Sequence, residues 1–423
     1  MSEAAALSAA PARSATWRGL LPWLAAALVL LAAPTLFTSG TALTMMSLMG
    51  IMVVFALAYN MLLGQTGMLS FGHAVYYGLG AFFVAHAMNA ARAGGWPIPL
   101  PAFPLVGGVA GLAFGALFGW VSTKRGGTAF AMISLGLAEL VASSANVLRS
   151  FFGGEEGITV NRTRLPRLFD LTFGPQLQVY YLIAAWCLVA AILMYGVTRT
   201  PLGRMCNAVR ENPERVQFVG YNPRTVRFLA FCLSAFFAGI AGGLAAINFE
   251  IVNGSYVGLS QSGTVLLAAF IGGTGLFAGP IVGAVVVTWL QVMLSDLTEI
   301  WQLYFGLLFI AIVLFAPGGI AGLVAMHGPL WRRGSLGRLA LPYAVAAPPA
   351  LAVLVGAVLA IEMAFRLLVK ASDGSAMTFA GLPLDAATAG PWLAAGALVG
   401  GGAALARPAF RRVAGAWHEA ARA

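Results

Sequence analysis

Apolar runs of about twenty residues follow one another along the chain, separated by short polar or basic segments. A helix of that length crosses the roughly 30 Å apolar core of a bilayer. The pattern predicts an all-α fold, a polytopic membrane helix bundle of ten core spans and two further C-terminal spans. We expect these spans at residues 19–38, 42–63, 70–88, 101–122, 128–149, 179–198, 228–249, 260–275, 277–296, 302–318, 340–361 and 388–406.

The stretch from Gly263 to Leu294 is apolar almost throughout, and it is too long for one span. As a single helix it would measure about 48 Å at 1.5 Å per residue. Glycines at 272, 273, 275 and 279, followed by Pro280, supply a break. The sequence therefore predicts two short spans or half-helices here.

Composition agrees with a membrane location, because 60% of the residues are hydrophobic and only 9% are charged. A soluble domain carries roughly 25% charged residues. The net charge of +10 lies in short clusters between spans, which fits membrane topology better than nucleic-acid binding. With both termini in the cytoplasm, 17 of the 24 basic residues fall on the inner side.

Two features near the ends of the chain bear on its organisation. The apolar run after Arg18 has the character of either a cleaved signal peptide or a first span. We favour a retained span, because the next run follows almost at once. We divide the chain into a core, residues 1–327, and an extension, residues 328–423, which holds the last two spans and a basic tail.

The segment 199–227, expected on the inner side, is rich in helix-capping signals. Asn212-Pro213 reads as an N-cap followed by proline at the first helical position, and Gly220 is placed to end that helix. Asn222-Pro223 then starts the next helix. Val216 and Val219 are expected on one face. A stiff helix could pass force from a partner to the spans, whereas the alternative is an ordinary solvated basic loop.

Glycines recur every fourth position in the fourth span, at 107, 111, 115 and 119, and form one stripe along a helix. Such stripes let membrane helices approach closely. The stripe fits tight packing within one chain or a seam against a second subunit.

Polar residues inside the apolar runs mark candidates for a substrate pathway. Glu139 is the clearest intramembrane acid, and a charge there is usually functional or paired. Gln65, Ser70 and His73 lie where a glycine-rich break can expose backbone groups to a polar passage. For His73 we favour packing or an interface position over a place in the pathway.

The sequence contains no motif that we recognise as catalytic or metal-binding. The two lysines, Lys124 and Lys370, do not follow a phosphate-binding glycine loop, so the chain carries no ATPase motif of its own. The histidines and the three cysteines show no metal-ligand spacing. We therefore expect a transport subunit that is not an enzyme and holds no metal or cofactor.

Several segments together resemble the LivM-type permeases of branched-chain amino acid transporters, over about residues 17–325. The resemblance rests on Gly203-Arg204, Ala208, Arg210-Glu211-Asn212, Gly220, Asn222, Phe231 and Ala238 to Gly242. It also rests on Asn60 to Gly67, Ser70 to His73, Glu139, Gly153 to Ile158, Gly272 to Gly275, Gly279-Pro280 and Pro317 to Gly322.

The resemblance implies a multi-pass permease of a bacterial inner membrane. It implies a second permease subunit, a periplasmic substrate-binding protein and two cytoplasmic ATPase subunits that bind ATP and Mg. It places the ATPase-coupling element at Arg204, Arg210, Glu211, Asn212, Pro213 and Gly220. The chain departs from the family after the seventh span, where Asn253 to Tyr256 replace a Ser-Pro pair. Urea or amide importers, other amino-acid importers and ATPase-independent transporters or channels are the alternatives.

Overall fold

The structure is a computed structural model that describes residues 19–94, 98–165, 172–332, 334–335, 337–370, 372 and 374–422. The basic residues Arg13, Arg18, Arg167 and Arg333, which entered the predicted topology, lie outside these ranges. The chain forms two compact units, Met1–Leu323 and Val324–Ala423.

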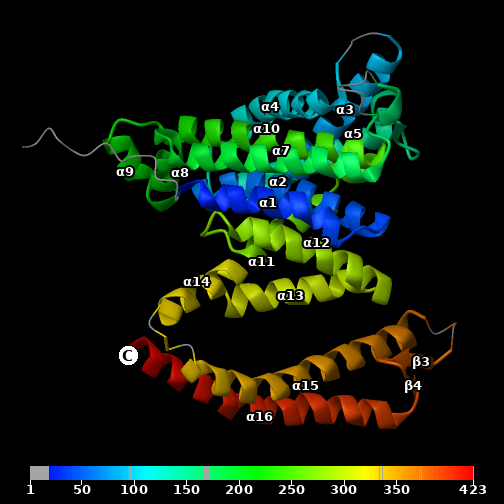
Figure 1. The fold of residues 1–423 in the computed structure, drawn as a ribbon, viewed down its shortest axis with the longest axis vertical. Coiled ribbons are helices and arrows are strands. Elements are labelled where there is room, and N and C mark those ends of the chain that lie inside the picture. The colour runs from blue at the N-terminus through cyan, green and yellow to red at the C-terminus, as the bar shows by residue number, and fades with distance from the viewer. Residues whose placement is uncertain are drawn as a thin grey trace, which may run out of the picture. The chain divides into compact units, whose positions relative to one another are not determined.

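The first unit is a bundle of helices (Figure 1). Its long helices are α1 Leu21–Leu36, α2 Gly40–Thr66, α3 Ala74–Arg92, α4 Phe103–Ser122, α5 Thr128–Val147, α7 Gln176–Arg199, α10 Pro223–Phe249, α11 Leu259–Gly272, α12 Gly279–Leu297 and α13 Trp301–Phe315. Short helices α6 Arg149–Phe152, α8 Pro201–Glu211 and α9 Pro213–Phe218 join them, and α14 Gly319–Arg332 contains the boundary between the units. We call the two ends of this bundle the α6 end and the α9 end.

Each predicted span coincides with a helix, which confirms the all-α membrane bundle, although α3, the third predicted span, is not among the stretches apolar enough to count as a membrane span. Among the described residues, nine helical stretches are long and apolar enough to cross a membrane, and α1 and α11 are shorter apolar helices. The predicted span 70–88 begins later than expected, at Ala74. Residues 67–73 instead form an irregular and mostly buried connection, the α2–α3 connection.

Helix α10 is the central element of the bundle, with most of its residues buried against α2, α3 and α4. The glycine stripe of α4 packs on it within this chain. A Cβ on Gly115 would lie 2.5 Å from the Ala235 Cβ, and one on Gly119 would lie 2.7 Å from the Phe231 ring. Since these contacts are internal, the stripe is a packing seam of the subunit itself.

The predicted break between the eighth and ninth spans lies at residues 273–278, between α11 and α12. Gly273 has φ +103°, a conformation that L side chains rarely adopt. The turn is close to α2, because a Cβ on Gly64 would lie 2.7 Å from the Thr274 carbonyl oxygen. The two half-helices therefore meet the last turn of α2 at the α9 end.

At the α6 end, one buried arginine ties the long connection between α5 and α7 to the end of α10. Arg162 donates to the carbonyl oxygens of Ile247 (3.2 Å), Asn248 (3.1 Å) and Phe173 (2.9 Å). Glu250 accepts from the Arg162 backbone N–H at 2.9 Å. In addition, β1 Ile158–Thr159 pairs antiparallel with β2 Ile251–Val252. The guanidinium thus satisfies carbonyls that the end of a helix leaves open.

Replacing Arg162 by Ala should destabilise this unit by about 3 kcal/mol, because buried carbonyls lose a charged donor. The ion pair itself contributes little, since Arg162 and the 36% exposed Glu250 side chain are 3.9 Å apart. The melting temperature in detergent is the measurement, with the exposed Arg164→Ala in the same turn as control. Equal melting temperatures for the two variants would contradict a stabilising role for the Arg162 hydrogen bonds.

The second unit is a helix pair with a small hairpin. It contains α15 Gly337–Leu368 and α16 Ala389–Arg422, joined by β3 Ala376–Phe379 and β4 Leu382–Asp385. The helices touch closely where a Cβ on Gly356 would lie 2.8 Å from the Leu398 Cβ. The basic tail predicted from Arg407 onward is wrong as a structural description, because these residues continue the helix α16.

Candidate functional site

Helices α8 and α9 form a stiff element between α7 and α10, because three local caps define it. The Thr200 side chain accepts from the Gly203 N–H, Asn212 accepts from Arg215 N–H at 3.0 Å, and Asn222 accepts from Arg224 N–H at 2.9 Å. A proline follows each capping residue at the first helical position. The structure thus contains the helix expected from Asn212-Pro213 and a second one, α8, which was not expected.

Gly220 ends α9 with φ +88°, and the next N–H, of Tyr221, donates to the Val216 carbonyl at 3.1 Å. This arrangement is a common way to end a helix, and glycine adopts it without strain. The assignment of Gly220 as a helix stop therefore agrees with the local geometry.

A small apolar core holds α8 and α9 against α10. It consists of Cys206, Val209, Val216, Val226 and Ala230. Val216 is only 3% exposed, whereas Val219 is 67% exposed. The expectation that both valines share one face is wrong, because α9 ends at Phe218 and Val219 is already its C-cap.

Arg210 connects this element to the end of α2. Its guanidinium donates to the Gly64 carbonyl oxygen, in the last turn of α2. Its aliphatic part covers the backbone of Gly67, where a Cβ would lie 2.9 Å from the Arg210 Cγ. A positive charge at a helix C-terminus is favourable, so this contact both caps α2 and links it to α8.

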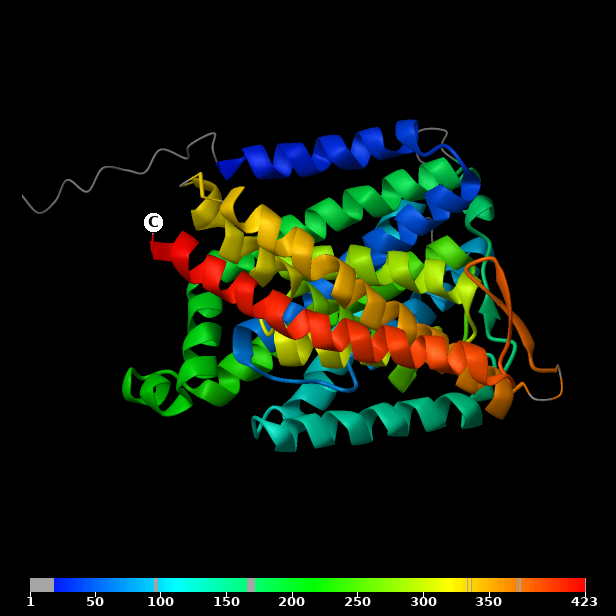
Figure 2. The ribbon, with the colours of Figure 1, turned by 90° about the horizontal axis from the view of Figure 1, so that it is seen from below.

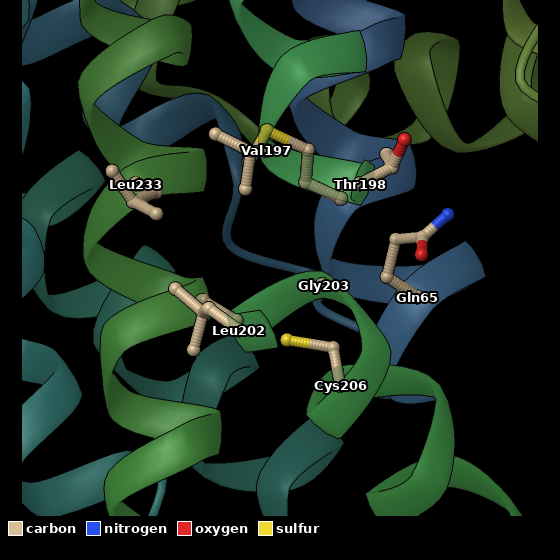
Figure 3. A pocket seen from close by; sticks show the side chains of 9 residues that line it. Gln65, Val197, Thr198, Leu202, Gly203, Cys206 and Leu233 are labelled. Carbon is tan, nitrogen blue, oxygen red and sulfur yellow. The ribbon is translucent and has the colours of Figure 1, made fainter. Parts of the chain in front are cut away.

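Gln65 is the candidate pathway residue that lies beside this junction. A small pocket of about 10 Å³ lies between α2, α7, α8 and α10, with Gln65, Thr198, Gly203 and Cys206 in its lining (Figure 3). That volume holds about one water molecule and is too small for an amino acid. The pocket lies at a junction between helices, and a place for Gln65 in a substrate pathway stays a prediction.

Burial raises the pKa of the Cys206 thiol to about 12. The thiol therefore stays protonated and unreactive at pH 8, since the thiolate is the nucleophile. Purified protein should leave Cys206 unmodified by a maleimide until it is unfolded, as peptide mass spectrometry would show. The thiol introduced by Gln217→Cys, at an exposed position of α9, should react at once. Comparable rates at both positions would show that α8 does not pack as described.

Ser70 and His73 are locked in the α2–α3 connection. Tyr59 donates to the Ser70 carbonyl oxygen at 3.0 Å. The Ser234 hydroxyl donates its single proton to the Ala58 carbonyl oxygen at 2.6 Å. The same hydroxyl oxygen therefore accepts from His73 Nε2–H, at 3.1 Å. The rings of Phe55, Tyr59 and Tyr76 surround the imidazole. This geometry favours a packing role for His73.

Other side chains pin the same connection from two further helices. Ser134 of α5 accepts from the Phe71 N–H at 3.1 Å, and Ser262 of α11 accepts from the Ala74 N–H at 3.0 Å. Several polar atoms nearby are buried without a hydrogen-bond partner, namely Asn60 Oδ1, Gln65 Oε1, Ser70 Oγ and His73 Nδ1. Buried polar atoms without a partner are rare, so this cluster among the described residues marks the connection as unusual within the bundle.

Glu139 lies elsewhere, on the exposed face of α5. The structure thus brings Arg210 and Gln65 together at the α9 end, fixes Ser70 and His73 inside the bundle, and places Glu139 on the outward face of α5, whose buried face packs on the α2–α3 connection. Of the other coupling candidates, Arg204, Glu211, Asn212 and Gly220 are exposed and Pro213 is half-buried.

The α8–α9 element carries an apolar surface that was not predicted from the sequence. Phe218 is 90% exposed, and the neighbouring Val219 and Tyr221 are also exposed. Phe218 and Val219 stand directly before the helix stop at Gly220, and this apolar pair was a signal in the sequence. A short helix such as α9 needs one buried apolar residue, Val216, to pack on the bundle, so the other apolar residues are free to face outward. Grouped apolar side chains on a polar segment indicate an interaction surface.

Together, the multi-pass helical bundle, its broken helices and its rigid capped segment define a membrane permease of the transport-subunit class. The chain belongs to the family described as branched-chain amino acid transport system / permease component, whose model matches residues 41–317. It is a multi-pass inner-membrane protein, and its resemblance to LivM-type permeases is confirmed.

Two permeases of *Escherichia coli* strain K12 and one of *Pseudomonas aeruginosa* illustrate the similarity. The chain is 26% identical to the high-affinity branched-chain amino acid transport system permease protein LivM of the former over 319 residues, covering 70% of this chain and 74% of the relative. It is 24% identical to LivH of the same strain, covering 63% and 90%. It is 25% identical to BraD of *P. aeruginosa*, covering 63% and 90%. No solved structure matches the chain.

Proposed function

We propose that the chain is the permease subunit of an ATP-driven importer of branched-chain or related small amino acids. Separate ATPase subunits, which bind ATP and Mg, drive it through the segment 199–227. The observation that carries this proposal is the capped α8–α9 element, linked by Arg210 to the last turn of α2. The names of the relatives support the amino-acid class of substrate.

Force applied to α9 has two routes into the bundle. The first route passes through Val216 and the small apolar core to α10, the most buried helix of the unit. The second passes through Arg210 to the end of α2, which lies against the turn between α11 and α12. Since packed helices move as rigid bodies, a displacement of α9 reaches both α10 and the half-helices.

The apolar surface at Phe218, Val219 and Tyr221 is the contact proposed for the ATPase subunit. Exposed aromatic residues at the tip of a rigid element have the character of binding hot spots. The exposed polar residues Arg204, Glu211 and Asn212 belong to the same α8–α9 element and are proposed to add polar contacts to the ATPase subunit.

The assembly proposed for transport contains a second permease, two cytoplasmic ATPase subunits and a periplasmic binding protein. The α9 end and both chain termini lie in the cytoplasm, as the distribution of basic residues favours. The α6 end then faces the binding protein.

Reconstitution of the complete complex in proteoliposomes tests this function. Radiolabelled leucine, delivered by the binding protein, should accumulate only when the ATPase subunits and ATP are present. Accumulation by the permease alone, with no ATPase subunit, would instead identify an ATPase-independent transporter.

A further inference from the structure

The exposed side of α5 carries a polar stripe beside the exposed apolar residues Met132, Leu140 and Val147. Glu139, Ser143 and Asn146 are all exposed and lie at i, i+4 and i+7, which places them in one stripe. Ser134, Ala138, Val141 and Ala145 form the opposite, buried face. Figure 2 shows α5, in turquoise, along the lower edge of the bundle.

Helices α4 and α13 present large apolar side chains on their outward-facing sides. The exposed large side chains of α4 are Leu105, Val109, Leu112, Leu117, Trp120 and Val121. Those of α13 are Leu303, Leu307, Ile310, Val313, Leu314 and Phe315. These two faces match lipid, whereas the outward stripe of α5 does not.

Lipid is a poor environment for this stripe. Glu139 is the twelfth residue of α5, about 17 Å from the start of the helix and near the middle of an apolar core of about 30 Å. A carboxylate at that depth is strongly unfavourable in contact with lipid. Ser143 and Asn146 extend the stripe from Glu139 toward the α6 end only. In the other direction it continues with Gly136 and Met132.

We propose that the Glu139–Ser143–Asn146 stripe lines the substrate passage, with the second permease subunit as its opposite wall. The stripe opens at the α6 end, and Glu139 meets the ammonium group of the amino acid. This inference rests on the function proposed above. The exposed apolar residues Leu140 and Val147 lie along one side of the stripe and seal that side of the passage against the partner.

Two observations identify the occupant of this face as a second, related permease. The chain matches both LivM and LivH of one *E. coli* strain, and both are named as permease proteins of the high-affinity branched-chain amino acid transport system. In addition, α5 is buried over 33% of its span, and since α12 is covered still less, at 28%, the polar stripe and not the exposure alone selects α5. A helix so little covered within its own chain leaves a wide surface for another subunit.

The buried side of α5 connects the stripe to the rest of the mechanism. Ser134 accepts from the Phe71 N–H, and a Cβ on Gly72 would lie 3.1 Å from the Ala138 Cβ. The α2–α3 connection therefore lies directly behind Glu139. Because Arg210 holds the start of that connection, motion of the coupling element reaches the stripe.

Thiol accessibility in the assembled, reconstituted complex tests the passage. Ser143→Cys and Asn146→Cys are compared with Val109→Cys, which lies on the lipid-facing side of α4. A charged, membrane-impermeant methanethiosulfonate added at the α6 end should modify the two stripe positions at least tenfold faster than the control. Substrate-loaded binding protein should slow that reaction. Equally slow reaction at all three positions would overturn the proposal.

Uptake by Glu139 variants provides the second readout. Glu139→Gln should lower leucine uptake at least tenfold, Glu139→Asp should retain part of it, and the second permease should still co-purify with both. Wild-type uptake by Glu139→Gln would refute the role of the carboxylate. Loss of co-purification would indicate a dry ion pair between subunits and refute the passage. Failure of ATP-driven uptake in the wild-type complex would instead refute the proposed function itself.

Discussion

Phe218→Asp is expected to abolish ATP-dependent leucine uptake while the permease itself stays folded. The side chain is 90% exposed, so its replacement removes no contact that holds the bundle together. Losing an aromatic hot spot typically costs about 2 kcal/mol or more of binding free energy, roughly a 30-fold loss of affinity. A buried carboxylate in the contact adds to that loss. Uptake and the co-purification of ATPase subunits are the measurements.

The matched control for this variant is Phe218→Trp, which keeps an aromatic surface at the tip of α9. It should retain uptake and co-purification within a few-fold of wild type. An unchanged melting temperature for Phe218→Asp separates lost docking from lost folding. If Phe218→Asp transported like the wild type, the apolar tip would not be the contact.

Gly239→Leu is expected to prevent folding of the permease. Gly239 lies where α10 meets both α3 and α4, and a Cβ there would contact the Gly107 backbone carbonyl directly. A Cβ on the facing Gly80 would lie 2.6 Å from the Gly239 Cα, so neither helix can yield by moving a side chain. Overpacking usually costs about 1–3 kcal/mol, and a backbone clash exceeds that range.

Gly196→Leu in α7 is the control, because a Cβ at Gly196 meets nothing within 4 Å. The amount of monodisperse protein after detergent extraction should collapse for Gly239→Leu and stay near wild type for Gly196→Leu. Normal yields of Gly239→Leu would contradict the close approach of α10 to α4.

Local chemistry explains which parts of this fold the sequence could predict. Apolar runs define helices because a membrane span must satisfy its own backbone hydrogen bonds. The helix starts at Asn212 and Asn222 could also be predicted, since each side chain accepts a hydrogen bond from a backbone N–H two or three residues later. The glycines and the proline near residue 275 predicted the break between α11 and α12, because both residue types interrupt a helix.

Long-range contacts explain what the sequence could not predict. Arg210 and Gly64 are 146 residues apart, and His73 and Ser234 are 161 residues apart. No periodicity indicates that Arg162 would close the end of α10, or that the glycines of α4 would meet Ala235 rather than another subunit. Polarity and a glycine-rich break grouped Gln65, Ser70, His73 and Glu139, whereas packing buries Ser70 and His73 together and leaves Glu139 on the outward face of α5.

The central claim is that ATPase subunits act on the permease through the tip of α9. A photoreactive phenylalanine analogue placed at position 218 in the assembled complex tests this contact most directly, with the same analogue at Leu177, at the start of α7, as control. We predict a cross-link to an ATPase subunit from position 218 and none from position 177. A transporting complex with no such cross-link from position 218, or with position 218 accessible from the periplasm, would contradict the account.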